Sequence, residues 1–259
     1  MIKIIKYILR NIDAYVQNIF RTKYDNDLTL TKTINVSIKH QETFGKYKGC
    51  YADKEVAIIA TAPSLNNYKP IKDVINVGVN RAFLKDDIKL DYIFMQDYSA
   101  VKSYMEDILQ DKYKDVVKFY GVCSYPRFYH QFGTKDAGVV FPESTILRHR
   151  ANKFYLYSKY PLLPVRFNVD IDNTWIADCG SIALSAAQFA LFTNPKKIYL
   201  VGCDCTSGYF NGQNGNNCDY LIKPWKELKK FADIYYPETE IVSVNPVGLK
   251  GVFTDLVQE

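Results

Sequence analysis

The sequence lacks the features that define several classes of protein. No run of about 18 apolar residues occurs, and the basic first residues are followed by neither an uninterrupted apolar stretch nor a small-residue cleavage site. Neither a membrane-spanning helix nor a secretory signal is therefore predicted. The three histidines, His40, His130 and His149, lie in no HExxH or catalytic-triad pattern, which argues against the common histidine-based hydrolase motifs.

The two common glycine-rich nucleotide motifs are also missing. No GxxxxGK(S/T) pattern occurs and no GxGxxG pattern follows a predicted strand, so neither a Walker-type site nor a standard dinucleotide site is predicted. The six cysteines include no CxxC pair, and the spacing of Cys203, Cys205 and Cys218 around Asp204 matches no standard zinc pattern. We therefore expect reduced thiols in a cytoplasmic protein, with no bound metal and no cofactor.

The composition is that of an ordinary globular protein. Hydrophobic residues make up 47% of the 259 residues and charged residues 24%, which suits one large domain or two small ones and excludes wholesale disorder. The 33 basic and 28 acidic residues give a formal net charge of +5. This excess is too small to predict a nucleic-acid partner.

Residues 1–23 have the pattern of a basic amphipathic helix. Apolar residues at helical spacing form one stripe, made of Ile4, Ile5, Ile8, Leu9, Ile12, Val16, Ile19 and Phe20. Lysines and arginines surround the stripe, which suits a peripheral position on the inner membrane surface or a partner; docking on the domain is the alternative. The polar stretch over residues 24–54 has weak periodicity and is interpreted as an extended arm or linker.

From residue 55 onward the pattern is that of an α/β domain. Short apolar runs typical of buried parallel strands alternate with helical or loop segments. The predicted strands are 56–60, 74–79, 92–95, 116–120, 198–201 and 240–244, and the predicted helices are 181–192 and 225–235. Residues 128–173 lack strong periodicity and are interpreted as an irregular lid insertion. We predict a single Rossmann-like domain over residues 55–259 with a mainly parallel sheet.

Polar residues follow four of the predicted strands. In an open parallel sheet such strand ends meet at one edge, where ligands bind. The residues are Thr61 to Ser64, Asn80 and Arg81, Gln96 to Tyr98, and Cys203 and Asp204. Ser64 is expected to cap a following helix and to leave a small anion site at its start. Gly180 and Ser181 are expected to open the alanine-rich helix 181–192 in the same way.

Four segments, in order, resemble one known family. They are EVAIIATAPSL (55–65), the asparagine in GVNRAF (78–83), the alanine-rich helix leading into KKIYLVGCD (196–204), and SVNPVGLKGVF (243–253). Together they resemble the bacterial CMP-sialic acid sialyltransferases, glycosyltransferase family 42, and glycosyltransferase-like proteins of capsule and lipooligosaccharide clusters. The resemblance implies one α/β nucleotide-binding domain with a lid, which transfers a CMP-activated acidic sugar with inversion and without a metal.

The resemblance also implies which residues bind the donor. Pro63 and Ser64 match the family's Gly-Asn-Gly-Pro-Ser turn, in which Thr61 here replaces the asparagine. The family's Thr-Ser-Gly before the long helix, which contacts the donor phosphate and carboxylate, is replaced by Asp178, Cys179 and Gly180. The residues expected at the nucleotide donor are Thr61, Pro63, Ser64, Asn80, Asp97, Cys179, Gly180, Ser181 and Asp204.

Two further residues are expected to be catalytic. Tyr209 matches one of the family tyrosines that stabilise the leaving phosphate, with Thr206 or Ser207 as the source of a second hydroxyl. The family's catalytic-base histidine is absent before helix 225–235. Asp219 is a nearby carboxylate, and a carboxylate can deprotonate an acceptor hydroxyl.

The sequence thus predicts a glycosyltransferase that moves a sugar from a nucleotide donor, with a CMP-sugar favoured, to a surface glycan or glycolipid. Two alternatives stay open. The missing histidine favours a non-catalytic protein of polysaccharide assembly. A phosphotransferase or pyrophosphokinase on a similar fold is the other alternative, for which a strict dependence on magnesium would be expected.

Overall fold

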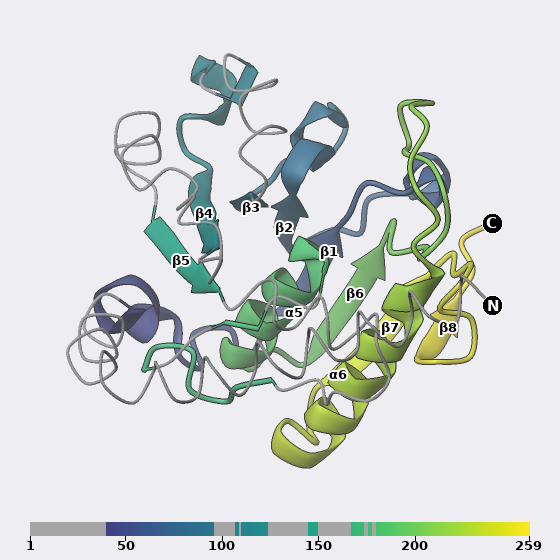
Figure 1. Ribbon diagram of the computed structural model, residues 1–259. Coiled ribbons are helices and arrows are strands. Elements are labelled where there is room, and N and C mark those ends of the chain that lie inside the picture. Colours follow the sequence, from purple (N-terminus) through teal and green to yellow (C-terminus); the bar gives the residue numbers. More distant parts are fainter. Residues whose placement is uncertain are drawn as a thin grey trace, which may run out of the picture.

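A parallel sheet organises the fold in the computed structural model, which describes residues 40–95, 107–108, 110–123, 145–149, 167–173, 176–177 and 180–259 (Figure 1). Within these residues the sheet has eight strands in the order β5-β4-β3-β2-β1-β6-β7-β8, and every neighbouring pair is parallel. The strands are β1 (Glu55–Ile59), β2 (Ile75–Val79), β3 (Tyr92–Met95), β4 (Val117–Cys123), β5 (Thr145–His149), β6 (Lys197–Val201), β7 (Glu240–Val244) and β8 (Thr254–Leu256). The predicted α/β class, the parallel sheet and all six predicted strands are confirmed.

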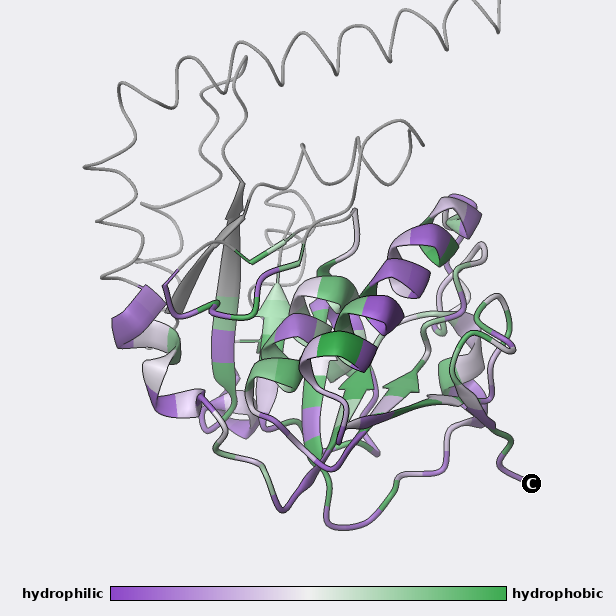
Figure 2. Cartoon of the chain, turned by 90° about the horizontal axis from the view of Figure 1, so that it is seen from below, coloured by the Kyte–Doolittle hydropathy of each residue, from purple (hydrophilic) through white to green (hydrophobic). Residues whose placement is uncertain are grey.

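The central strands form because their apolar runs are buried on both faces. In β1, Val56 and Ile58 belong to one hydrophobic core, whereas Ala57 and Ile59 belong to the core on the opposite face. Two-sided burial removes the alternation of polar and apolar residues that a half-exposed strand shows. Figure 2 shows the corresponding hydrophobic colour on the central strands, with hydrophilic residues along the outer loops.

Two helices cover one face of the sheet, side by side in Figure 1. In α5 (Ile182–Phe192) every residue is buried, and its small alanines let it pack closely across the first three strands. The second helix, α6 (Ile222–Tyr235), is amphipathic and begins three residues earlier than predicted, because Pro224 is tolerated in a first helical turn. Short 3-10 helices, η2 (Pro63–Asn67) and η3 (Asn80–Leu84), follow β1 and β2 and contribute Leu65 and Phe83 to the other core.

The expectation of an extended arm is wrong for residues 40–54. Residues 40–44 are helical, η1 (Gly45–Tyr47) follows, and the side chains of His40, Phe44 and Tyr47 are buried. Phe44 stacks on Phe119 of β4 with ring centroids 5.5 Å apart, and Tyr47 meets Phe189 of α5 edge-on at 5.3 Å. Aromatic packing against the sheet thus outweighs the polar character of the stretch. Residues 24–39 and the predicted helix over residues 1–23 lie outside the described residues.

The predicted irregular insertion over residues 128–173 contains regular structure. Residues Thr145–His149 form β5, which pairs in parallel with β4 at the edge of the sheet. Its short sequence, TILRH, carries two basic residues, and within the described residues it is an edge strand, a position that tolerates charged side chains. Near the other end of the range, Ile171 is fully buried in the core. The remainder of the range, up to residue 166, lies outside the described residues. The exposed edge strand β8 was also not predicted.

Tyr236, which caps the C-terminal end of α6, makes the stability of the fold sensitive to alkaline pH. Burial, together with the carboxylates of Asp170 and Asp172, raises its pKa from 10.0 to about 12. The folded chain therefore holds this proton more tightly than the unfolded chain. Its contribution to stability is fully present below pH 10 and is lost as the pH rises towards 12.

We expect Tyr236→Phe to flatten the fall in unfolding free energy between pH 10 and 12, measured by urea denaturation at a series of pH values. Tyr235→Phe, at an exposed position of the same helix, is the matched control. Equal slopes for Tyr236→Phe and the unaltered protein would contradict the assignment.

Candidate functional site

The order of the strands reverses beside β1. The chain adds β2 to β5 on one side of β1, and then β6 to β8 on its other side. The connections after β1 and β6 therefore leave the sheet in opposite directions, and open α/β folds bind ligands at the carboxyl ends of two such strands. The predicted ligand-binding position is therefore formed by the residues that directly follow the two strands, which are Ala60 and those after it, and Gly202 and those after it.

Ser64 and Asp204 join the two strand ends directly. The Asp204 carboxylate accepts a hydrogen bond from the Ser64 amide, with 2.9 Å between N and Oδ2, and Oδ1 accepts a second from the Ser64 hydroxyl. Asp204 is only 3% exposed, so these bonds satisfy a carboxylate that is almost entirely removed from water. Two predicted donor residues are thus brought into contact.

The same contact corrects the expected role of Ser64. Ser64 lies inside η2, a 3-10 helix of five residues whose N-cap is Ala62 and which has no side-chain capping bond. Both the hydroxyl and the amide point instead to Asp204. The anion that the sequence led us to expect at this amide is therefore supplied by the chain itself.

Two glycines allow the backbone to approach the Ser64–Asp204 pair. Gly202 has a φ of +64°, and a Cβ on it would lie 2.8 Å from the Ala60 carbonyl oxygen. A Cβ on Gly248 would lie 2.4 Å from the Asp204 carbonyl oxygen, which accepts a hydrogen bond from the Gly248 amide at 2.8 Å. Sequence reasoning missed both residues, although Gly202 stands directly after an apolar run, where a tight turn is needed.

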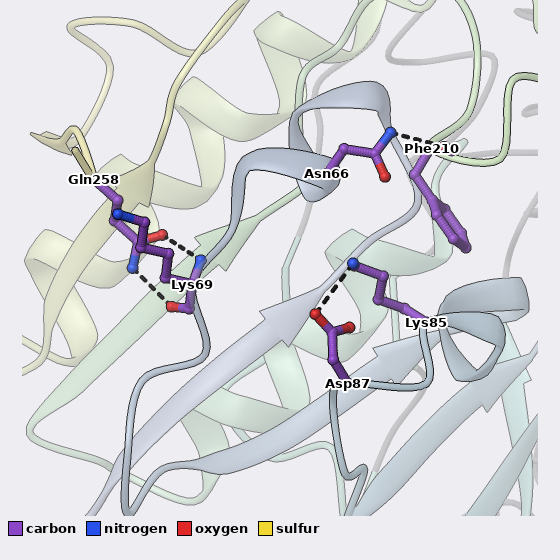
Figure 3. Close-up of polar contacts among 6 residues, drawn as sticks. All are labelled: Asn66, Lys69, Lys85, Asp87, Phe210 and Gln258. Atoms are coloured by element: carbon purple, nitrogen blue, oxygen red, sulfur yellow. Dashed lines mark hydrogen bonds and ion pairs between the residues drawn. The ribbon is translucent and has the colours of Figure 1, made fainter.

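A polar loop, residues 206–217, follows Asp204 and is pinned to the turn after β1. The Phe210 amide donates to the Thr61 carbonyl at 2.9 Å, and the Asn66 side-chain amide donates to the Phe210 carbonyl at 2.8 Å (Figure 3). Within the loop, the Tyr209 amide donates to the Gln213 carbonyl at 3.0 Å. Thr61 thus contributes its backbone carbonyl to the contact between the turn and the loop. Tyr209 stays 45% exposed, so its side chain is accessible to a ligand.

The turn after β1 is held from its other side by the segment that follows β8. The Lys69 amide donates to Oε1 of Gln258 at 2.8 Å, and the Gln258 side chain donates back to the Lys69 carbonyl at 2.9 Å (Figure 3). The Gln258 amide in turn donates to the Asn245 side chain, which lies directly after β7, at 2.8 Å. The loop after β1 is therefore fixed between two neighbouring elements.

Asn80 directly follows β2 at the same edge of the sheet and begins η3. Its φ of +48° is a left-handed conformation that asparagine tolerates better than most residues. The next residue, Arg81, was noted at this strand end but was not among the expected donor-binding residues. Its Nη1 donates to the side-chain carbonyl of Gln213 at 2.7 Å and so links the end of β2 to the polar loop.

Ser181 stands at the N-cap of α5, as predicted, but its side chain makes no capping bond there. Gly180 precedes it with a φ of +85°. Asp219, the predicted base, is exposed and begins η5 (Asp219–Leu221), from which α6 continues. Asp97 and Cys179 lie outside the described residues.

The thiols around Asp204 are held in their neutral form. Burial raises the pKa of Cys205 to about 12 and also raises the pKa values of Cys203 and Cys218. Protonated thiols are poor nucleophiles and poor metal ligands. Within the described part of the chain, no group of three or more His, Cys, Asp or Glu side chains is arranged to hold a metal ion.

The described residues contain no helix with the length and apolar character needed to cross a membrane. This finding covers α5 and α6 and does not extend to the predicted helix over residues 1–23.

The chain is similar to several solved structures of sialyltransferases. CstII from Campylobacter jejuni, in complex with the substrate analogue CMP-3FNeuAc, is 18% identical with a TM-score of 0.45, over 73% of this chain and 80% of that chain. The monofunctional alpha-2,3-sialyltransferase Cst-I from the same organism is 19% identical with a TM-score of 0.46, over 74% and 75%. No protein-family model and no curated protein matches the chain.

Proposed function

We propose that the protein is a glycosyltransferase that binds a CMP-activated acidic sugar between the ends of β1 and β6. The observation that carries the proposal is the Ser64–Asp204 contact, which builds a rigid polar turn where open α/β folds bind nucleotides. Asn80 adjoins this turn from β2. We propose a surface glycan or glycolipid as the acceptor, with residues 1–23 as the contact to the cytoplasmic face of a membrane.

The proposed reaction is a single inverting displacement that needs no metal. Asp219 takes the proton of the acceptor hydroxyl, and the acceptor oxygen forms a bond to the anomeric carbon of the sugar. The bond from that carbon to the CMP phosphate oxygen breaks, and CMP leaves with the electron pair. The Tyr209 hydroxyl donates a hydrogen bond to the leaving phosphate. Both side chains are exposed, so both are open to substrates.

Thermal unfolding in the presence of CMP, UDP, GDP or ADP tests the nucleotide. A ligand that binds the native state at about 100 times its Kd stabilises it by about 2.7 kcal/mol. We expect CMP to raise the melting temperature selectively. Selective stabilisation by another nucleotide would show that the donor carries that nucleotide in place of CMP. The absence of any shift in melting temperature would overturn the proposal.

We expect Asp219→Asn to lower turnover about 100-fold, which is within the usual contribution of a general base, and to leave the CMP-induced thermal shift unchanged. Single-turnover measurements with a CMP-sugar and an acceptor would show the loss in the chemical step. Asp233→Asn, at an exposed position of α6, is the control and should keep full activity. Unaltered turnover in Asp219→Asn would show that Asp219 is not the general base.

A further inference from the structure

Arg81 places a permanent positive charge at the carboxyl end of β2. This strand is the parallel neighbour of β1, so Arg81 stands beside the turn that contains Thr61 and Ser64. A guanidinium stays protonated at every physiological pH and presents its N–H donors as a planar fork. Such a fork matches the two oxygens of a carboxylate.

Gln213 fixes the direction of this side chain. Its Oε1 accepts from Arg81 Nη1 at 2.7 Å, although the two residues are 132 positions apart in the sequence. The Gln213 backbone carbonyl accepts from the Tyr209 amide at 3.0 Å, and the neighbouring Phe210 amide is bonded to the Thr61 carbonyl. A chain of hydrogen bonds therefore runs from Arg81 through the polar loop to the turn after β1.

We propose that Arg81, oriented by Gln213, binds the carboxylate of the donor sugar and so selects acidic sugars; this inference rests on the proposed function. In a sialic-acid-type donor the carboxylate and the phosphate oxygen are attached to the same anomeric carbon. A group that recognises the carboxylate must therefore lie close to the group that contacts the leaving phosphate. The Gln213 side chain accepts from Arg81 and its backbone carbonyl accepts from the Tyr209 amide, so Arg81 is tied to the same loop that carries Tyr209.

The amide at Ser64 does not offer an alternative for this carboxylate. It is already bonded to the Asp204 carboxylate, and a second anion there would face the charge of Asp204 at close range. Arg81 carries the opposite charge and reaches the site from the strand on the other side of β1. The arrangement thus keeps the donor anion away from Asp204.

The test compares CMP with CMP-N-acetylneuraminic acid by calorimetry, using proteins that carry Asp219→Asn so that no transfer occurs. In the Arg81→Met variant we expect the affinity for the CMP-sugar to fall about 10-fold to 100-fold, as for the loss of a charge-assisted hydrogen bond, with less than a 2-fold change for CMP. Arg81→Lys keeps the charge and loses the planar fork. Its affinity for the CMP-sugar should lie between that of the parent protein and that of Arg81→Met. Gln213→Ala should weaken CMP-sugar binding less than Arg81→Met does.

Three results would overturn this inference and leave the proposed function intact. The first is an equal loss of affinity for CMP and the CMP-sugar in Arg81→Met, which would assign Arg81 to the phosphate. The second is unaltered affinity of Arg81→Met for both ligands. The third is equal affinity of the parent protein for both ligands. If the parent protein binds neither ligand, the proposed function itself fails. Melting temperatures of all variants without ligand identify any that fail to fold, and Arg81→Lys keeps the comparison open if Arg81→Met is one of them.

Discussion

Asp204→Ala is expected to lower the free energy of unfolding by about 3 to 5 kcal/mol and to abolish stabilisation by CMP. The substitution removes two hydrogen bonds to a charged group, each of which contributes about 1.5 to 3 kcal/mol. It also leaves the Ser64 amide buried without its partner, at the point where the ends of β1 and β6 are joined. Urea denaturation and thermal shift with CMP measure the two effects.

Ser64→Ala is the matched control, because it removes the hydroxyl bond to Asp204 and keeps the amide bond. We expect it to cost about 1 to 2 kcal/mol. The loss in the double variant should be smaller than the sum of the two single losses, since both substitutions remove one shared bond. Additive losses, or an Asp204→Ala protein with the original stability, would show that the contact does not hold the site together.

Gly202→Ala is expected to cost about 4 kcal/mol, for two reasons. Alanine is strained at a φ of +64°, by about 1 to 2 kcal/mol, and its Cβ would lie 2.8 Å from the Ala60 carbonyl oxygen, which adds about 1 to 3 kcal/mol as the backbone shifts. Because Ala60 leads into the turn with Ser64, we also expect weaker CMP binding.

Gly49→Ala separates the two causes. Gly49 has nearly the same φ, +65°, but nothing lies within 4 Å of a Cβ built on it. Its replacement should cost only the conformational strain, about 1 to 2 kcal/mol, and should leave CMP binding intact. If both substitutions cost the same in urea denaturation, the close approach between Gly202 and Ala60 would have no part in stability.

Most of the sheet could be predicted because its strands carry their own signal. The runs in β1 and β6 are apolar on both faces, and such a run has few alternatives to a buried parallel strand. The short edge strands β5 and β8 lack this signal, because pairing with a neighbour, rather than their composition, makes them strands. The prediction for the segment from His40 to Tyr47 was wrong for the same reason, because the burial of this segment depends on Phe119 and Phe189.

The candidate site could be located but not assembled from the sequence. A polar residue after each strand predicts which edge of the sheet binds a ligand, and Ser64 and Asp204 were both identified in this way. Their mutual hydrogen bonds join residues 140 positions apart, and the Arg81–Gln213 bond spans 132 positions. No local pattern encodes either partner, so the internal use of the Ser64 amide and the contribution of Arg81 became visible only in three dimensions.

The position of β1 in the sheet has a consequence for synthesis on the ribosome. One side of β1 pairs with β2, which follows after a short connection, but the other side pairs with β6, which is made about 140 residues later. At about 5 to 20 residues per second, β6 emerges roughly 7 to 28 s after β1. Throughout that interval the nascent chain presents an apolar strand with unpaired backbone amides and carbonyls. Such an edge invites pairing with other chains, so chaperone binding would act on this protein before residues 197–201 leave the ribosome.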